Sequence, residues 1–219
     1  MSDSKRTKPW WRRPAVGWVL VWVVITVIAV VGTRFYTPGT EPSSTSGEQD
    51  IVTDVAGYAE QEFSASIVPT IEQNAQDLPT LVEALAAGAD AAGDKYGHRS
   101  GDSPWSFPVS ATGTIGEASF GEVALSVDGV SGVEIGVQTG PAIKGTAVRD
   151  AVGTITFGMF QNQTAFSQVA TELNNQVKAT VFSEYDLASM QGQEVTILGA
   201  FSYDDPSHIL ITPVRVEVK

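Results

Sequence analysis

Four residues of the segment GPAIKGTAVRD, which runs from Gly140 to Asp150, have side chains that could do chemistry. Lys144 and Arg149 are cationic, while Thr146 and Asp150 supply a hydroxyl and a carboxylate. A guanidinium can form two parallel hydrogen bonds to a carboxylate or to an anionic ligand. The segment is therefore either a structural corner, in which Arg149 pairs with a carboxylate such as Asp150, or a cationic binding spot.

Amide side chains follow this segment and could extend such a spot into a small pocket. Amides, hydroxyls and a guanidinium are the groups that fix sugars or small anions in binding sites. The candidate ligand-binding residues are Lys144, Thr146, Arg149, Asn162, Gln163 and Asn174. Asn162-Gln163-Thr164 also fits a glycosylation acceptor, but we expect Asn162 to cap the helix that follows it.

Motifs that would indicate catalysis or a cofactor are missing from the sequence. It contains no P-loop, no G-x-G-x-x-G, no G-x-S-x-G and no H-E-x-x-H. The only histidines, His98 and His208, fall in separate predicted loops, where we expect them to be solvated. Asp204 and Asp205 precede Pro206, and aspartates in this position bond the backbone of their own turn. We predict no catalytic residue, no metal site and no cofactor, so the protein is not expected to be an enzyme.

The charge of the chain is unevenly distributed. The 219 residues include 13 Lys and Arg against 25 Asp and Glu, but six of the basic residues lie within the first 34. The rest of the chain has a net charge of −17. A domain this acidic repels phosphate backbones, so nucleic acid is excluded as a partner. The sequence has no cysteine, which excludes disulfides, thiol catalysis and lipid attachment through a cysteine.

The N-terminal part of the chain has the pattern of a membrane anchor. Residues 15–32 carry no charge, and a helix of this length spans roughly the hydrocarbon core of a bilayer. Positive charges dominate the residues before it, which places the N-terminus in the cytoplasm. A cleaved signal peptide is the alternative, although no A-x-A-like site follows. We therefore predict a cytoplasmic tail and single-pass anchor in residues 1–36, with the C-terminal domain outside the cell membrane.

A flexible tether and one extracytoplasmic domain follow the anchor. Residues 37–50 are rich in Pro, Gly, Ser and Thr and have no large apolar residue to bury, as in a tether. The domain is predicted to cover residues 51–219 and to begin with a helical part, residues 51–97. There, apolar residues recur at helical spacing, and Pro69 and Pro79 fit helix starts.

The period of the apolar residues changes to two after this helical part. Residues 105–219 alternate in short segments between Gly-containing turns, and β character is expected to continue through residues 142–160. A long amphipathic helix then buries Phe166, Val169, Ala170, Leu173, Val177 and Val181, and two further strands follow. This order predicts an α+β fold with a five- to six-stranded, OB-like Greek-key barrel and one long helix.

Several of these segments carry a family resemblance. The stretch from Gly140 to Asn174, the Tyr96-Gly97 pair and the C-terminal GAF…ITPVRVEV resemble the predicted periplasmic lipoprotein family, domain of unknown function 2291. Many members look like lipoproteins encoded beside sugar-uptake ABC transporters, so the resemblance implies an envelope protein linked to carbohydrate import. The chain lacks the lipobox cysteine of that pattern, and its apolar segment would anchor it instead.

The sequence leaves three classes of function open. The first is a membrane-anchored binding or accessory protein for a small polar ligand, with a component of a sugar ABC transporter as its partner. The second is a structural or protein-interaction module of the cell envelope. The third is a hydrolase of envelope carbohydrate, whose paired carboxylates can lie far apart in a sequence.

Overall fold

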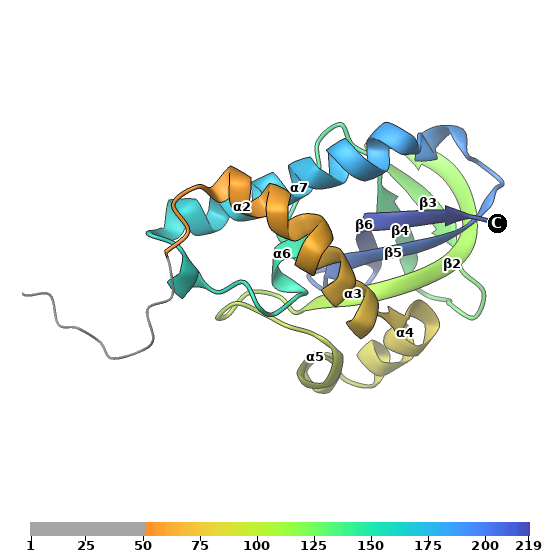
Figure 1. Cartoon of the computed structure of the whole chain (residues 1–219). Helices are drawn as coiled ribbons and strands as arrows, with labels where there is room; N and C mark the ends of the chain where they lie inside the picture. Colours follow the sequence, from red (N-terminus) through yellow and green to blue (C-terminus); the bar gives the residue numbers. More distant parts are fainter. Residues whose placement is uncertain (1–50) are drawn as a thin grey trace, which may run out of the picture. The chain divides into compact units, whose positions relative to one another are not determined.

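Five strands close into a barrel in the computed structural model, which describes residues 51–219 (Figure 1). They are β2 (Ser106–Ser119), β3 (Glu122–Ser126), β4 (Glu134–Gln138), β5 (Glu194–Ser202) and β6 (His208–Val218). Their order is β2-β3-β4-β6-β5, and β5 pairs back with β2. β4 and β6 are parallel, and the other neighbours in this ring are antiparallel. This is the Greek-key order predicted for an OB-type barrel.

A sixth strand extends the sheet beyond the barrel. β1 (Gln76–Asp77) pairs in parallel with β2 next to the seam between β2 and β5. The five- to six-stranded barrel predicted from the sequence therefore corresponds to five barrel strands and one short addition.

Glycines let the strands of two neighbouring pairs, β2 with β3 and β5 with β6, come unusually close. A Cβ at Gly113 of β2 would lie 2.4 Å from the carbonyl oxygen of Ser126 on β3, and one at Gly199 of β5 would lie 2.4 Å from that of Thr212 on β6. The pairing of β5 with β6 also shifts its register between Leu198 and Gly199. Glycines and bulges of this kind bend strands so that a sheet can close.

The barrel core is built across its closing seam. Phe107 of β2 and Phe201 of β5 are opposite each other in the register and fully buried, and their rings stack with centroids 5.4 Å apart. Aromatic pairs of this geometry stabilise a core beyond the area that they bury. Alternate residues of β2, including Val109 and Ala111, point into the same core.

The helical part precedes the barrel as predicted. It consists of α2 (Val55–Glu62), a π-helical turn η2 (Phe63–Ile67), α3 (Val68–Asn74), α4 (Leu78–Ala87) and α5 (Ala89–Tyr96). The π turn lies just before Pro69, which has no N–H to donate. The N–H of Val68 bonds instead to the carbonyl oxygen of Phe63, so the helix continues through the proline.

The long helix α7 (Gln163–Glu184) lies between β4 and β5 in the chain and packs beside α2 (Figure 1). All six of its residues that were predicted to face the core are buried. The Asn162 side chain caps the helix by accepting a 3.0 Å hydrogen bond from the N–H of Ala165. The periodicity of the apolar residues and the cap both predicted this helix correctly.

The β character expected for residues 142–160 is wrong. This stretch holds the short helix α6 (Ala147–Asp150) and a 3-10 turn, η3 (Phe157–Met159). Ala147, Val148, Ala151 and Val152 are all buried, an arrangement without the alternation of a half-exposed strand. The hydrogen bond from the Thr146 hydroxyl to Asp150, 2.6 Å long, closes the turn of α6.

The predicted anchor and tether, residues 1–50, lie outside the described residues. Within residues 51–219, no helix has the length and apolar character that crossing a membrane requires. The single-pass topology therefore stays a prediction from the sequence.

Candidate functional site

Arg149, next to the end of the segment from Gly140 to Asp150, is buried, and all three of its guanidinium nitrogens have partners within the protein. Its Nε and Nη2 atoms each lie 2.7 Å from Oδ1 of Asp150, which is also buried. Its Nη1 atom donates a 3.0 Å hydrogen bond to the carbonyl oxygen of Phe166, and its guanidinium lies over the Phe166 ring. Arg149 therefore joins α6 to the start of α7, which is the structural corner of the two alternatives.

Other polar groups of the segment also hold the chain in place. The Gln138 side chain of β4 bonds to both backbone groups of Lys144, accepting from its N–H at 2.9 Å and donating to its carbonyl oxygen at 3.1 Å. The buried Asn174 of α7 donates to the carbonyl oxygen of Gly145 at 3.0 Å. Gly145 has a φ of +86°, which favours glycine. The Lys144 side chain itself is exposed, as expected for this residue.

The six predicted ligand-binding residues fall into two groups in the structure. Thr146 and Arg149 meet at Asp150, and Asn174 reaches the neighbouring Gly145. Asn162 and Gln163 are exposed at the start of α7. Most of these polar groups are therefore used to fix the path of the chain between β4 and α7.

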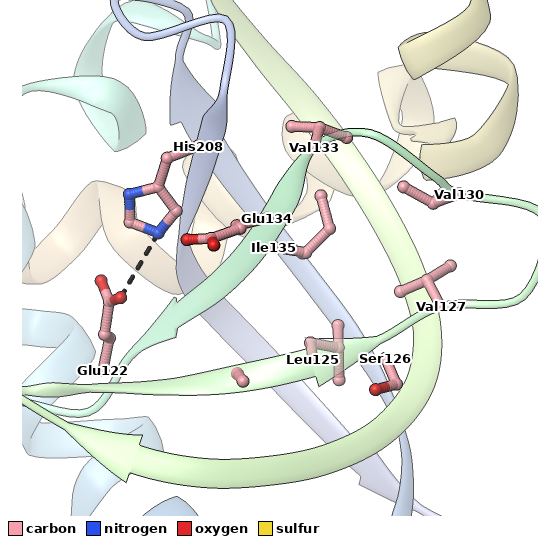
Figure 2. Close-up of a pocket in the computed structure, with 10 residues that line it drawn as sticks. Glu122, Leu125, Ser126, Val127, Val130, Val133, Glu134, Ile135 and His208 are labelled. Atoms are coloured by element: carbon pink, nitrogen blue, oxygen red, sulfur yellow. Dashed lines mark ion pairs between the residues drawn. The ribbon is translucent and has the colours of Figure 1, made fainter.

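A cavity of about 510 Å³ lies elsewhere, between β3 and β4 (Figure 2). The two strands pair only from Glu122↔Gln138 to Ala124↔Gly136, and beyond this point they separate. The loop that joins them and the start of β6 complete the walls. The opening thus results from the end of strand pairing inside one hairpin.

One end of the cavity carries ionisable side chains. Nε2 of His208 lies 3.3 Å from Oε1 of Glu122, and each side chain is about one-third exposed, at 30% and 32%. Figure 2 shows the two pointing toward each other, with Glu134 beside them. Glu134 is the register partner of His208 in the parallel pair β4–β6. This end is therefore a cluster of hydrogen-bonding groups with a net negative charge.

Gly136 makes room for this pair. A Cβ at Gly136 would lie 3.0 Å from Nε2 of His208 and 3.3 Å from Cδ of Glu122. The ring and the carboxyl group therefore lie directly over the backbone of β4. A larger residue at this position would displace both.

The rest of the cavity is mostly apolar, with Ser126 of β3 as a further polar side chain. Leu125 of β3 and Ile135 of β4 are buried beneath the opening, and valines of the connecting loop form its far end. These valines are Val127, Val130 and Val133. A ligand here would meet hydrogen-bonding groups at one end and apolar side chains along its length.

The loop before His208 is held by its own turn. Oδ1 of Asp205 accepts hydrogen bonds from the hydroxyl and the backbone N–H of Ser207, at 2.7 Å and 2.8 Å. These bonds, chiefly that from the Ser207 hydroxyl, hold the pKa of Asp205 below its usual value, and His208 adds to the effect. The turn chemistry predicted for this aspartate is confirmed.

Sequence reasoning missed the cavity and misjudged His208, whereas His98 is exposed, as expected. His208 was expected to be a solvated loop residue, but it begins β6 and faces Glu122, which is far away in the sequence. His98 exchanges two backbone hydrogen bonds with Ser106, and its ring lies against Gly153. The alternation of apolar residues within β3 and β4 was visible, but the parallel pairing that brings β6 beside β4 was not.

Comparisons with known proteins support the family and the fold. A model of the family described as predicted periplasmic lipoprotein, domain of unknown function 2291, matches residues 23–217. A crystal structure of an OB-fold protein from Thermotoga maritima is similar to 77% of this chain and 99% of its own, with 21% identity and a TM-score of 0.63. No curated protein matches the sequence.

Proposed function

Since the chain belongs to the predicted periplasmic lipoprotein family, we propose that it is a membrane-anchored binding protein that holds a small saccharide outside the cell membrane. The proposed site is the cavity between β3 and β4, and the proposed role is that of an accessory to carbohydrate uptake by an ABC transporter. The role is binding without catalysis. One observation carries the proposal, namely an open cavity that combines carboxylates and an imidazole with an apolar floor.

The chemistry of the cavity fits a polyhydroxylated ligand. The carboxylates of Glu122 and Glu134 can accept hydrogen bonds from hydroxyl groups, and such charge-assisted bonds are stronger than neutral ones. His208 can donate or accept, depending on its protonation state. Leu125 and Ile135 offer apolar contacts to the C–H groups of a sugar ring.

The charge of the cavity selects among saccharides. Two glutamates and one histidine line it, within a chain that has a net charge of −17 after Arg34. This field attracts cations and repels phosphates. The proposed order of affinity is therefore amino sugar first, neutral sugar next and sugar phosphate last.

The position of the cavity in the fold supports the same proposal. OB-folds bind oligosaccharides and oligonucleotides on the face of their second and third strands, and β3 and β4 are the second and third strands of this barrel. The negative charge argues against the oligonucleotide. Saccharide remains as the ligand class that fits both the fold and the charge.

The proposed location rests on the family and the N-terminal sequence. The family description supports a periplasmic protein, and residues 15–32 supply an uncharged segment long enough to span a membrane. The basic residues before it place the N-terminus in the cytoplasm. We propose one crossing, with the barrel outside.

Calorimetric titration of the detergent-purified full chain with glucosamine, glucose and glucose 6-phosphate tests the proposed function. We expect glucosamine to bind more tightly than glucose, and glucose 6-phosphate not to bind. Glu122→Gln removes a charge from the cavity, so it is expected to weaken glucosamine binding about tenfold, the effect of losing one charge-assisted hydrogen bond. Glu117→Gln, an exposed change on β2 outside the cavity lining, is the matched control and is expected to have no effect. Binding of none of the three would contradict the saccharide proposal and favour the protein-interaction module, whereas equal affinities for all three would contradict the proposed effect of the cavity charge.

A further inference from the structure

One end of the domain presents a surface without charge. No Asp, Glu, Lys, Arg or His occurs from Ala151 to Thr171, although the chain is otherwise strongly acidic. This stretch is well exposed, so burial does not explain the missing charges. Its exposed residues are Gly153, Thr154, Thr156, Phe157, Gly158, Gln161, Asn162, Gln163, Thr164, Ser167, Gln168 and Thr171, and we call this surface the uncharged tip.

Two large apolar side chains are exposed at the uncharged tip. Phe157 is 49% exposed, and Ile51 is 46% exposed. The N–H of Val52 donates to the carbonyl oxygen of Met159 at 2.9 Å, and Val52 forms an isolated parallel bridge with Phe160. Ile51 therefore lies beside the turn that carries Phe157. The described part of the chain begins at this end, next to the starts of α2 and α7 (Figure 1).

The exposed Phe157 is held in place by buried neighbours. Its ring packs edge-on against Phe166, with centroids 5.8 Å apart. Phe166 in turn lies under the guanidinium of Arg149, which also bonds to its carbonyl oxygen. A surface aromatic supported in this way stays exposed without collapsing onto the domain.

Within residues 51–219, several charged groups border the uncharged tip, and most of them are engaged by the protein itself. The carboxylate of Asp54 accepts a 2.9 Å hydrogen bond from the N–H of Gly57 and caps the positive end of α2. Arg149 and Asp150 pair with each other below the surface. His98, which lies against Gly153, borders the beginning of the stretch. The first acidic residue on α7 is Glu172, more than two turns after its start.

We propose that the uncharged tip rests on the lipid headgroups of the membrane that anchors the chain, with Phe157 and Ile51 inserted between them. This inference rests on the proposed anchor. Anionic headgroups repel an acidic domain, so the face with the fewest carboxylates is the one that can approach them. Apolar side chains such as Phe and Leu of proteins that lie on a membrane are buried at the boundary between headgroups and acyl chains. The first described residue, Ile51, lies at this end of the domain, and 18 residues separate it in the sequence from the uncharged segment that ends at Gly32.

The absence of cysteine from the sequence makes a direct test possible, because a single introduced thiol can be labelled selectively. In Gly158→Cys the label replaces no side chain, and a Cβ there has open space. Ala188→Cys, exposed beyond the other end of α7, is the matched control. An environment-sensitive fluorophore is attached to the full chain at one of these two cysteines. The labelled protein is then inserted into phosphatidylethanolamine–phosphatidylglycerol vesicles that contain a lipid with a nitroxide on its headgroup.

We expect a blue shift and strong nitroxide quenching for the label at residue 158, and the spectrum of an aqueous label at residue 188. Adding Phe157→Glu to Gly158→Cys should abolish the quenching, and it should lower the melting temperature only by the lost packing of the ring on Phe166, so that the domain stays folded. Flotation of the vesicles measures separately whether the protein is anchored in the membrane. Protein that fails to float contradicts the anchor and the tip together, whereas floating protein with equal, weak quenching at both sites contradicts the tip alone. Protection of residue 158 only in native membranes that contain other proteins would also overturn the proposal, because a protein would then be the partner.

Discussion

Arg149 connects three parts of the molecule through one side chain. It neutralises the buried Asp150 of α6, bonds to the backbone at the start of α7, and covers the ring that supports Phe157. From the residue types of the segment alone, Arg149 could either pair with a carboxylate of the protein or bind a ligand. The structure supports the pairing, because every arm of the guanidinium has a partner inside the protein.

Arg149→Ala is expected to destabilise the domain by about 3–5 kcal/mol, because it leaves the Asp150 carboxylate buried without its partner. Lys144→Ala, in the same segment, is the matched control and should change the unfolding free energy by no more than about 0.5 kcal/mol. The Lys144 side chain is exposed, and its bonds to Gln138 involve only the backbone. Urea unfolding of both variants measures the difference, and equal stability of the two would contradict the structural role of Arg149.

Elements whose signals are local could be predicted from the sequence, whereas those that depend on distant partners could not. The spacing of apolar residues and the Asn162 cap predicted α7, since both act within one helix. Residues 142–160 were predicted wrongly because their charged pair, Arg149 and Asp150, is buried and because consecutive residues rather than alternate ones are buried there. The cavity depends on where β3 and β4 stop pairing and on the parallel arrival of β6, and neither leaves a local pattern.

An exposed ion pair joins the helical part to the barrel and makes a small part of the domain's stability depend on pH. Nη1 and Nη2 of Arg215 on β6 lie 2.7 Å and 3.0 Å from the two carboxylate oxygens of Glu72 on α3. The hydrogen bond from Arg215, and then its charge, lower the pKa of Glu72. A lowered folded-state pKa adds stability above the unfolded pKa, and this contribution disappears as the pH falls through the folded one.

Glu72→Gln is therefore expected to lower the melting temperature slightly at pH 7 and to have a smaller effect as the pH approaches about 3, below the ordinary pKa of a glutamate. The pair is exposed, so the loss is small even at neutral pH. Glu60→Gln, exposed on α2, is the control. Melting curves from pH 7 to acid test this expectation, and a difference from wild type that grows on acidification would contradict it.

At the scale of the whole molecule, charge is distributed unevenly between the cavity and the uncharged tip. The strongly acidic domain opens an acidic cavity between β3 and β4, and it lacks charge over the stretch from Ala151 to Thr171. Composition alone gives the acidity and predicts that nucleic acid is not a partner. It could not assign the charges to surfaces, because that requires knowing which segments are exposed and which lie together.

Amide chemical-shift mapping on isotope-labelled full-length protein tests the central claim, that the cavity between β3 and β4 is the binding site. We predict that glucosamine shifts the resonances of His208 and of those residues between 122 and 135 that line the cavity. We predict no shifts for residues 144–150 or for Asn174, whose polar groups are engaged within the protein. Shifts confined to residues 144–174 would place the ligand at the residues first singled out from the sequence, and would contradict the account.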